Sequence, residues 1–178
     1  MDEMKRIDRV LKYKGSIVDF YDDIMEFPNG NTAHWDYIAH RKGAAAVLPV
    51  LEDGRILMVR QYRNAIERET LEIPAGARDS VQERTIDCAA RECEEETGYR
   101  AGKIEPLVTV ATTVAFCNEI VEVFLATDLE KHSQHLDENE YLNVEAHTIE
   151  ELKEMVLNRQ IQDSKTVAAI LAYVCKIS

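Results

Sequence analysis

The chain is organised around residues 71–99, LEIPAGARDSVQERTIDCAARECEEETGY. Near the end of this stretch, Glu92, Glu94, Glu95 and Glu96 place four carboxylates within five residues of an expected helix. Like charges spaced three or four residues apart on a helix repel each other, and negative charge in the last turns opposes the helix macrodipole. We therefore expect these carboxylates to have a use, and binding of a divalent cation is the obvious one.

The overall composition bounds the class of protein. The chain has 178 residues, of which 46% are hydrophobic and 30% charged, as in a soluble globular protein with one sizeable core. Its formal net charge of −12 argues against binding to nucleic acid or to an anionic membrane surface. The same charge would repel a phosphate-ester ligand unless metal ions are bound first.

Signals for membranes or secretion are not seen in the sequence. No apolar run approaches the roughly 18–20 residues of a membrane span, and the N-terminal MDEMKRIDRV lacks the apolar segment of a signal peptide. The cysteines Cys88, Cys93, Cys117 and Cys175 have no C-x-x-C spacing, and Cys93 and Cys175 occupy core-like helical positions. We therefore expect a cytoplasmic protein with reduced thiols, and neither zinc nor disulfides.

The first forty residues predict a small antiparallel β module. Residues 17–27 are rich in β-branched and aromatic side chains, which favour a strand, and residues 32–39 would return beside it. Asn29-Gly30 between them is typical of a type I′ hairpin. Residues 1–40 carry too little apolar surface to fold alone, so the module must pack on residues 41–178, the expected main domain, or on a second copy.

The main domain alternates strands and helices. An apolar run at 43–51 and a run at 55–62, joined by a turn at Asp53-Gly54, predict a pair of strands. A brief strand at 71–73 stops at Pro74. Further strands are expected at 104–114, 120–125 and 142–146, with a polar loop at 127–139 between the last two.

Three helices are predicted from their ends and faces. Ser80 with Glu83 has the spacing of a capping box at the start of the carboxylate helix, and Gly98 is a natural residue after its end. Thr148 with Glu151 predicts a second capping box, on a helix ending near residue 158. Asp163 would cap a final helix, whose expected buried face is Val167, Ile170, Leu171 and Val174.

The carboxylate helix carries a recognisable motif. Glu83 followed by Arg91-Glu92-Cys93-x-Glu95-Glu96-x-Gly98-Tyr99 resembles the Nudix box, G-x5-E-x7-R-E-U-x-E-E-x-G-U, where U is a bulky apolar residue. One departure is at the glycine: Gly76 is separated from Glu83 by six residues, so Ala77 occupies the counted position. The flanking segments VRQYR (59–63), LEIPAG (71–76), LDENE (136–140) and IQDSKT (161–166) are similar to the ADP-ribose pyrophosphatase branch of that family.

The resemblance implies a fold and an assembly. The expected fold is a Nudix-type α/β/α sandwich with a mixed sheet, plus the N-terminal antiparallel β module. Members of the branch are commonly homodimers that exchange this module. The implied reaction is hydrolysis of ADP-ribose to AMP and ribose 5-phosphate. Two alternatives stay open: hydrolysis of another nucleoside diphosphate-sugar or dinucleotide, and a sensor that binds ADP-ribose without cleaving it.

The resemblance also implies a metal site. Glu92 and Glu96 match the family's main ligands of Mg²⁺ or Mn²⁺, and carboxylates four residues apart on a helix can share one cation. Glu95 matches a third ligand or a shaping residue, and the remaining expected contacts are Glu140 and the backbone carbonyl of Ala75. Glu94 would be solvated. Glu83 has two open interpretations, since a capping role suffices by itself.

Other residues are assigned by resemblance to catalysis and substrate binding. Glu138 matches the carboxylate that activates water, and Arg91 would hold the glutamates in place through ion pairs. Arg63 matches a residue that grips a substrate phosphate, although a surface arginine would look the same. The assigned substrate contacts are completed by Glu119 for the terminal ribose, Ala77 at the glycine's counted position, and Trp35, which would stack on adenine or lie in a core or interface.

Overall fold

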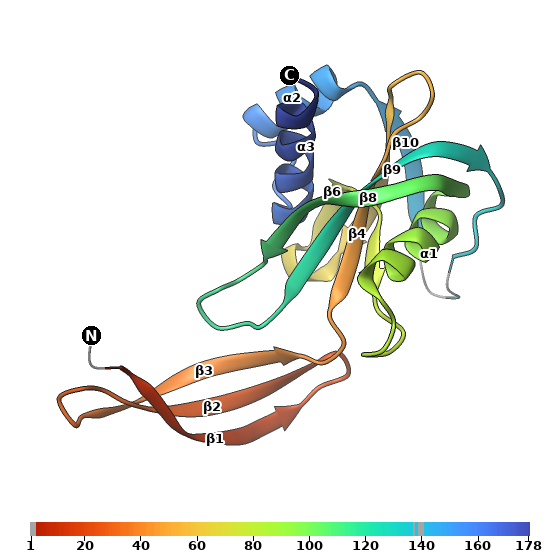
Figure 1. Cartoon of the computed structure of the whole chain (residues 1–178). Coiled ribbons are helices and arrows are strands. Elements are labelled where there is room, and N and C mark those ends of the chain that lie inside the picture. Colours follow the sequence, from red (N-terminus) through yellow and green to blue (C-terminus); the bar gives the residue numbers. More distant parts are fainter. Residues whose placement is uncertain (1–2, 137, 139–140) are drawn as a thin grey trace.

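The structure of the chain is a computed structural model that describes residues 3–136, 138 and 141–178. Three sheets and three α-helices make up the described part (Figure 1). An antiparallel sheet at the N-terminus projects from the remainder, in which two further sheets pack with the helices. Glu140, an expected metal contact, lies outside the described residues.

The N-terminal sheet has the order β1-β2-β3. Its strands are β1 (Lys5–Lys14), β2 (Val18–Glu26) and β3 (Thr32–His40). The predictions of β2 and β3 are confirmed, whereas β1 was not predicted, because nearly all its side chains are exposed and leave no apolar alternation. The type I′ turn is wrong: Gly30 has a positive φ of 81°, but Asn29 does not, and type I′ requires both.

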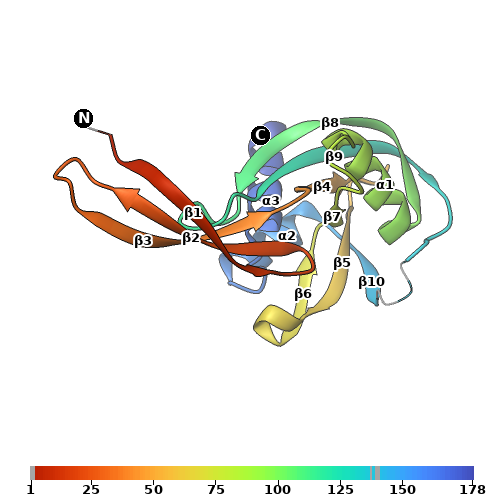
Figure 2. The same ribbon diagram turned by 90° about the horizontal axis from the view of Figure 1, so that it is seen from below.

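The N-terminal sheet extends away from the rest of the chain, as Figure 2 shows. It meets the main part through backbone hydrogen bonds between β3 and the segment before Glu119. The Ile38 N–H donates to the Phe116 carbonyl at 2.7 Å, and the Asn118 N–H donates to the Ile38 carbonyl at 3.2 Å. The division into domains at residues 40 and 41 stays a prediction.

The larger of the two remaining sheets is mixed. Its order is β7-β4-β9-β8, with β4 and β9 parallel and the other pairs antiparallel. The strands are β4 (Ala44–Pro49), β7 (Ala75–Ala77), β8 (Tyr99–Ala111) and β9 (Ile120–Lys131). Because β9 continues to Lys131, the polar loop expected at 127–139 is shorter than predicted.

The other sheet is antiparallel, in the order β10-β5-β6. Its strands are β5 (Ile56–Arg63), β6 (Arg68–Glu72) and β10 (Leu142–His147), with a short 3-10 helix at Asn64–Ile66 between β5 and β6. The predicted pairing of β4 with β5 is wrong. Beyond one bridge between Val50 and Ile56, the two strands separate into different sheets.

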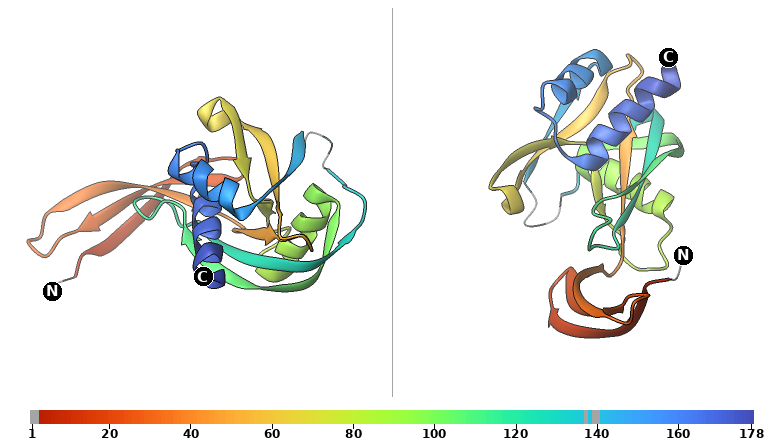
Figure 3. Two further views of the ribbon diagram at one scale, coloured as in Figure 1. Left: turned by 90° about the horizontal axis from the view of Figure 1, so that it is seen from above. Right: turned by 90° about the vertical axis from the view of Figure 1, so that its left-hand side faces the viewer.

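Alternation along β4 divides the core into two layers. Ala45 and Val47 pack with α1 (Thr85–Thr97), whereas Ala46 and Leu48 face a larger cluster that includes α2 (Ile149–Leu157) and α3 (Ser164–Ile177). Helices therefore cover both faces of the mixed sheet (Figure 3). The predicted α/β/α sandwich with a mixed sheet is confirmed. Within the described part of the chain, no helix is long and apolar enough to cross a membrane.

The helix ends confirm some predictions and correct others. Helix α2 has the predicted capping box of Thr148 and Glu151, and Asp163 caps α3. Gly98 ends α1 with a φ of 72°.

The capping box at Ser80 and Glu83 is wrong, because α1 begins only at Thr85 and has no side-chain cap. Ser80 instead stabilises a turn before the helix, where its hydroxyl accepts from the Glu83 N–H at 3.3 Å. In α3, Leu171 and Cys175 are exposed, and Thr166, Ala169 and Ile170 form the buried face.

Candidate active site

Helix α1 presents two buried carboxylates to the backbone between β6 and α1. The exposed fraction is 8% for Glu92 and 1% for Glu96. The Ala75 N–H donates to Glu96 Oε2 at 3.1 Å. Carboxylates are costly to bury unless hydrogen bonds or cations compensate. The two carboxylates therefore lie where a bound cation would compensate their charge, beside backbone carbonyl groups that can supply further oxygen ligands.

The backbone of Gly76 lies directly against the Glu92 carboxylate. A Cβ added to Gly76 would lie 2.2 Å from Glu92 Oε1 and 2.3 Å from its Cδ. No side chain fits there while Glu92 keeps its place. Counting along the motif pointed to Ala77 as the glycine position, but the close approach occurs at Gly76. The Ala77 carbonyl instead accepts a hydrogen bond from Arg91 Nη2 at 3.1 Å.

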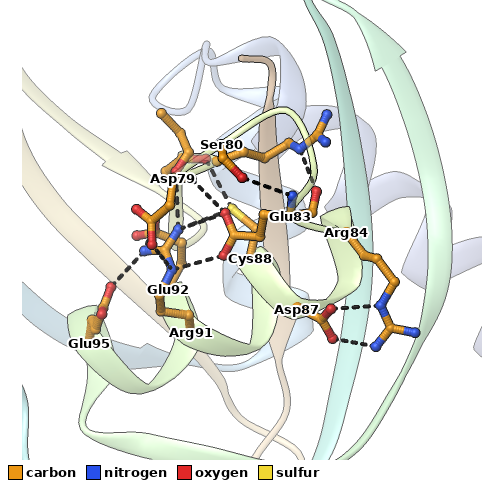
Figure 4. Close-up of polar contacts among 12 residues, drawn as sticks. Asp79, Ser80, Glu83, Arg84, Asp87, Cys88, Arg91, Glu92 and Glu95 are labelled. Carbon is orange, nitrogen blue, oxygen red and sulfur yellow. Dashed lines mark hydrogen bonds and ion pairs between the residues drawn. The ribbon is translucent and has the colours of Figure 1, made fainter.

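Arg91 links the acidic side chains of the site (Figure 4). Its Nη1 donates to Glu92 Oε1 at 2.6 Å and to Glu95 Oε2 at 2.8 Å, and its Nε donates to Glu83 Oε1 at 3.2 Å. Burial alone would lower the pKa of Arg91, but the surrounding carboxylates outweigh burial and raise it. The guanidinium thus stays charged and spreads three carboxylates around itself. Its predicted ion pairs with the glutamates are present.

Glu83 belongs to this cluster, although the helix does not begin beside it. Its Oε2 accepts from the Asp79 N–H at 2.6 Å. Burial would raise the pKa of Glu83, but hydrogen bonds from Arg91 and from the Asp79 N–H lower it overall. Glu83 is therefore ionised near neutral pH and orders the turn that precedes α1.

A cavity of about 330 Å³ opens over these groups. Its acidic lining comes from Asp79, Glu92 and Glu95, and its basic lining from Lys42, Arg78, Arg91 and His135. Within residues 3–136, 138 and 141–178, no three histidine, cysteine, aspartate or glutamate side chains are arranged to hold a metal by themselves. The oxygen-rich donor set nevertheless suits a hard divalent cation, if backbone oxygens such as that of Ala75 complete it.

The segment after β9 is fastened to the C-terminal end of α1. The His132 N–H donates to the Gly98 carbonyl at 2.7 Å, and the His135 N–H donates to the Glu95 carbonyl at 2.9 Å. Gln134 Nε2 donates to the Glu96 carbonyl at 2.6 Å. These bonds satisfy carbonyls that lack partners at a helix end. Glu138, which is exposed, follows three residues after His135.

Comparison with known proteins agrees with this geometry. The family model described as "NUDIX domain" matches residues 40–169. The chain belongs to the Nudix family. Nudix hydrolases generally depend on divalent metal ions, which the carboxylate helix of this chain is suited to bind.

Individual relatives extend over nearly the whole chain. The chain is 39% identical to an ADP-ribose pyrophosphatase of Bacillus subtilis (strain 168) over 170 residues, 94% of this chain and 91% of the relative. It is 35% identical to a "Methanol dehydrogenase activator" of Bacillus methanolicus, with the same coverage of 94% and 91%. A crystal structure of an "ADP compounds hydrolase" superposes with a TM-score of 0.88 at 18% identity, covering 98% of this chain and 94% of that chain. The structural likeness shows the fold alone.

A second cavity of this Nudix hydrolase, of about 500 Å³, contains Arg63. Arg63 makes two hydrogen bonds to Glu72, from Nε at 2.8 Å and from Nη2 at 2.6 Å. Lys165 Nζ donates to the same carboxylate at 2.6 Å. Glu72 and Lys165 were not singled out from the sequence, because only the fold brings together residues 93 positions apart. The Asp-x-Lys-Thr run at the start of α3 was the available signal.

Two predicted substrate contacts lie elsewhere. Glu119 accepts a hydrogen bond from Thr112 Oγ1 at 2.8 Å, and its Oε1 lies 3.7 Å from His40 Nε2. Trp35 on β3 is 44% exposed and packs edge-on against Phe27. Neither residue lines the cavity over Glu92 or the cavity at Arg63. Within one copy of the Nudix chain, they are not brought to the carboxylate site.

Proposed function

We propose that the chain hydrolyses the pyrophosphate bond of ADP-ribose, with water as the second substrate and AMP and ribose 5-phosphate as products. One observation carries the proposal: Glu92 and Glu96 are both buried and both face the backbone at Ala75 and Gly76. The choice of ADP-ribose is supported by the similarity to the Bacillus subtilis ADP-ribose pyrophosphatase over nearly the whole chain.

The metal would be Mg²⁺ or Mn²⁺. Glu92 and Glu96 would hold it, with the Ala75 carbonyl and Glu95 as further ligands and Glu140 as a contact outside the described residues. When bound, such a cation offsets the negative charge of the pyrophosphate and helps to orient water. The chain has a net charge of −12, so the acidic site should repel the substrate in the absence of the cation.

Arg91 keeps the acidic side chains in position in this proposal. Its hydrogen bonds to Glu83, Glu92 and Glu95 restrict the rotamers of these side chains. Cys88 lies beside it, with Sγ 3.5 Å from Arg91 Nη2. Burial raises the pKa of the Cys88 thiol to about 12. This thiol is therefore neutral at pH 7 and does not compete with the carboxylates as a ligand or nucleophile.

Glu138 would act as the general base. A carboxylate in an exposed position can take a proton from the attacking water and release it to solvent. The bonds of Gln134 and His135 to α1 keep the preceding chain beside the carboxylate helix. Arg63 would contact a substrate phosphate, and Glu119 the terminal ribose.

The chain would function as a homodimer in the cytoplasm. Strand β1 and the residues beside it expose apolar side chains that a second copy could cover: Met4, Ile7, Val10, Leu11, Tyr13 and Ile17. Trp35 on the same sheet would then stack on adenine or pack in the interface. Sedimentation velocity of the full chain and of a chain lacking residues 1–40 tests the dimer.

The function is tested by measuring AMP release from a panel of nucleoside diphosphate derivatives with Mg²⁺ and with Mn²⁺. Glu96→Gln should nearly abolish hydrolysis of ADP-ribose while circular dichroism stays unchanged. Asp87→Asn is the matched control on α1, because Asp87 is exposed and pairs only with Arg84 among the described residues. Full activity of Glu96→Gln would refute the metal assignment.

The same panel separates the alternatives. Faster turnover of another nucleoside diphosphate-sugar or of a dinucleotide would replace ADP-ribose as the proposed substrate. The proposed hydrolysis of a pyrophosphate bond would be retained. Tight binding of ADP-ribose without AMP release in Mg²⁺ would identify a sensor.

A further inference from the structure

The cavity at Arg63 is built by elements that are distant in sequence. Its charged and polar lining comes from the end of β5, from β6 and from the start of α3, and Ala65 and Ile66 contribute apolar surface. Strand β6 ends at Glu72. Ala75 at the carboxylate site follows three residues later, so one short piece of backbone joins the two cavities.

Glu72 lines this cavity and accepts hydrogen bonds from residues on several of its elements. It is 2% exposed and accepts hydrogen bonds from two cations, Arg63 and Lys165, and from Thr70 Oγ1 at 2.6 Å. Burial would raise the pKa of Glu72, but the hydrogen bonds and the Lys165 charge outweigh it and lower the pKa to about 2. Glu72 is therefore a carboxylate shared by two cations.

The Lys165 side chain is also fixed by a carboxylate at the start of α3. Its side chain is 13% exposed, and Nζ lies 2.9 Å from Asp163 Oδ2. Asp163 also accepts from Thr166 Oγ1 at 2.6 Å, and this hydroxyl accepts from the Ile73 N–H at 3.0 Å. The start of α3 is thus bonded both to the Glu72 carboxylate and to the backbone leading to Ala75.

Arg63 is fixed on one side and open on the other. Nε and Nη2 bond to Glu72, whereas Nη1 makes no hydrogen bond to any described residue, and the side chain is 41% exposed. The charged side chains that line the cavity carry one net positive charge in sum: Arg63, Arg68 and Lys165 against Glu72 and Asp163. Without Lys165, the charges of this lining would sum to zero, and Glu72 would keep Arg63 as its only cationic partner among the described residues.

We propose that Lys165 is a positioning residue for substrate binding: by sharing Glu72, it keeps the cavity lining net positive and Arg63 in a fixed orientation toward a phosphate of the substrate. The inference rests on the proposed function, because it takes the anion in this cavity to be part of ADP-ribose. A cation–anion hydrogen bond is worth enough to change the affinity for an anion by about tenfold or more.

A purely structural role for Lys165 makes different predictions. If Lys165 only joined α3 to β6, its loss would lower stability and the fraction of active enzyme, and hence kcat. A role through Arg63 acts on the binding of the anionic substrate, and therefore on KM. It also requires that the loss of Lys165 leave KM unchanged when Arg63 is already absent, because Lys165 would act on KM only through Arg63.

The experiment is steady-state hydrolysis of ADP-ribose by the full chain at fixed Mg²⁺, at a temperature where every variant is folded. Lys165→Met should raise KM about tenfold and change kcat less than about twofold. Lys165→Arg should restore KM to within about threefold of wild type, because it keeps the charge. In an Arg63→Ala background, Lys165→Met should raise KM no further.

Arg60→Met is the matched control. Arg60 lies on the same strand, β5, and pairs with Glu145 on β10, with Nη2 to Oε2 at 3.1 Å. Its substitution removes one cation from one carboxylate outside the cavity, and KM should stay unchanged. If Lys165→Met does not fold, Lys165→Gln takes its place, since it keeps a donor for Glu72 and removes the charge.

The outcomes separate the inference from the function. The inference is overturned if Lys165→Met lowers kcat at unchanged KM, if its effect adds fully to that of Arg63→Ala, or if Lys165→Arg does not restore KM. A wild-type chain that does not hydrolyse ADP-ribose would overturn the proposed function instead. The variants would then be compared by the Kd of ADP-ribose, where equal values, or no binding to wild type, would overturn the inference as well.

Discussion

The contact between Gly76 and Glu92 makes a sharp prediction about Gly76→Ala. The new Cβ would lie 2.2 Å from Glu92 Oε1 and 2.5 Å from Oε2, whereas ordinary contacts begin at 3.4 Å. The Glu92 carboxylate must therefore retreat by about 1 Å. Because Glu92 is a predicted metal ligand, the displacement falls on the site itself.

The expected effects on stability and on activity differ greatly. Gly76 does not have a positive φ, so alanine can adopt its backbone conformation. The alanine stabilises by about 0.4–1 kcal/mol through the unfolded chain, and a displaced Glu92 rotamer costs about 0.5–1.5 kcal/mol, so the free energy of unfolding should barely change. A 1 Å displacement in a catalytic arrangement, by contrast, can reduce the rate by roughly 10²-fold.

The assay compares three quantities for wild type and Gly76→Ala. These are kcat/KM for ADP-ribose, the Kd of Mn²⁺ from electron paramagnetic resonance, and the midpoint of urea unfolding. We expect a roughly 10²-fold lower kcat/KM, weaker Mn²⁺ binding and an unchanged midpoint. In a Glu92→Gln background, Gly76→Ala should have little further effect. Activity and Mn²⁺ affinity within twofold of wild type would refute the reasoning.

Three further predictions concern the base, the buried carboxylate and the central arginine. Glu138→Gln should lower kcat for ADP-ribose about 10²-fold or more at nearly constant KM; the same loss in Glu140→Gln alone would move the base to Glu140. The pKa of Glu72 is lowered to about 2. At pH values above the pKa that Glu72 has in the unfolded chain, the ionised Glu72 therefore stabilises the fold by about 3 kcal/mol. This contribution is lost as the pH falls from about 4.5 toward 2. The difference in urea-unfolding free energy between wild type and Glu72→Gln should accordingly shrink from pH 7 to pH 3. A difference that stays constant over this range would contradict the predicted contribution of Glu72. Arg91→Met should lower the unfolding free energy by about 2 kcal/mol, because carboxylates lose their shared cation, and added Mg²⁺ should restore part of it, as thermal unfolding with and without Mg²⁺ would show.

Local signals predicted much of the fold. Gly98, Thr148 and Asp163 mark helix ends where side-chain or backbone geometry within a few residues decides the outcome, and each was identified correctly. The Ser80 and Glu83 pair had the right spacing for a cap, but Glu83 bonds to Arg91 instead. That partner comes from two helical turns later and is better placed to compensate a carboxylate.

Long-range pairing was harder to predict. A tight turn at Gly54 normally joins paired strands, yet β4 pairs with β7 and β9 instead of β5. Nothing in residues 44–63 indicates this, because the choice depends on partners that come later in the chain. Strand β1 was missed for a related reason: its exposed side chains follow no apolar period.

The candidate site was predictable where its residues share one helix. The spacing of Glu92 and Glu96 already placed them together, and the structure shows both buried. The glycine was misplaced by one position, since loop length can vary without changing which backbone atom approaches Glu92. The link between Glu72 and Lys165 is a tertiary contact, and the Asp-x-Lys-Thr run at the start of α3 does not by itself indicate which residue Lys165 contacts.

The bonds between α1 and the segment at Gln134 and His135 have a consequence for the effective concentration of the proposed base. Glu138 is three residues beyond His135, and three residues of extended chain span at most about 10 Å. While the His135 N–H remains bonded to the Glu95 carbonyl, the backbone of Glu138 stays within that radius of the fastened residue. Much of the conformational entropy of bringing a base to the carboxylate helix is therefore lost once, during folding, and not again in every catalytic cycle.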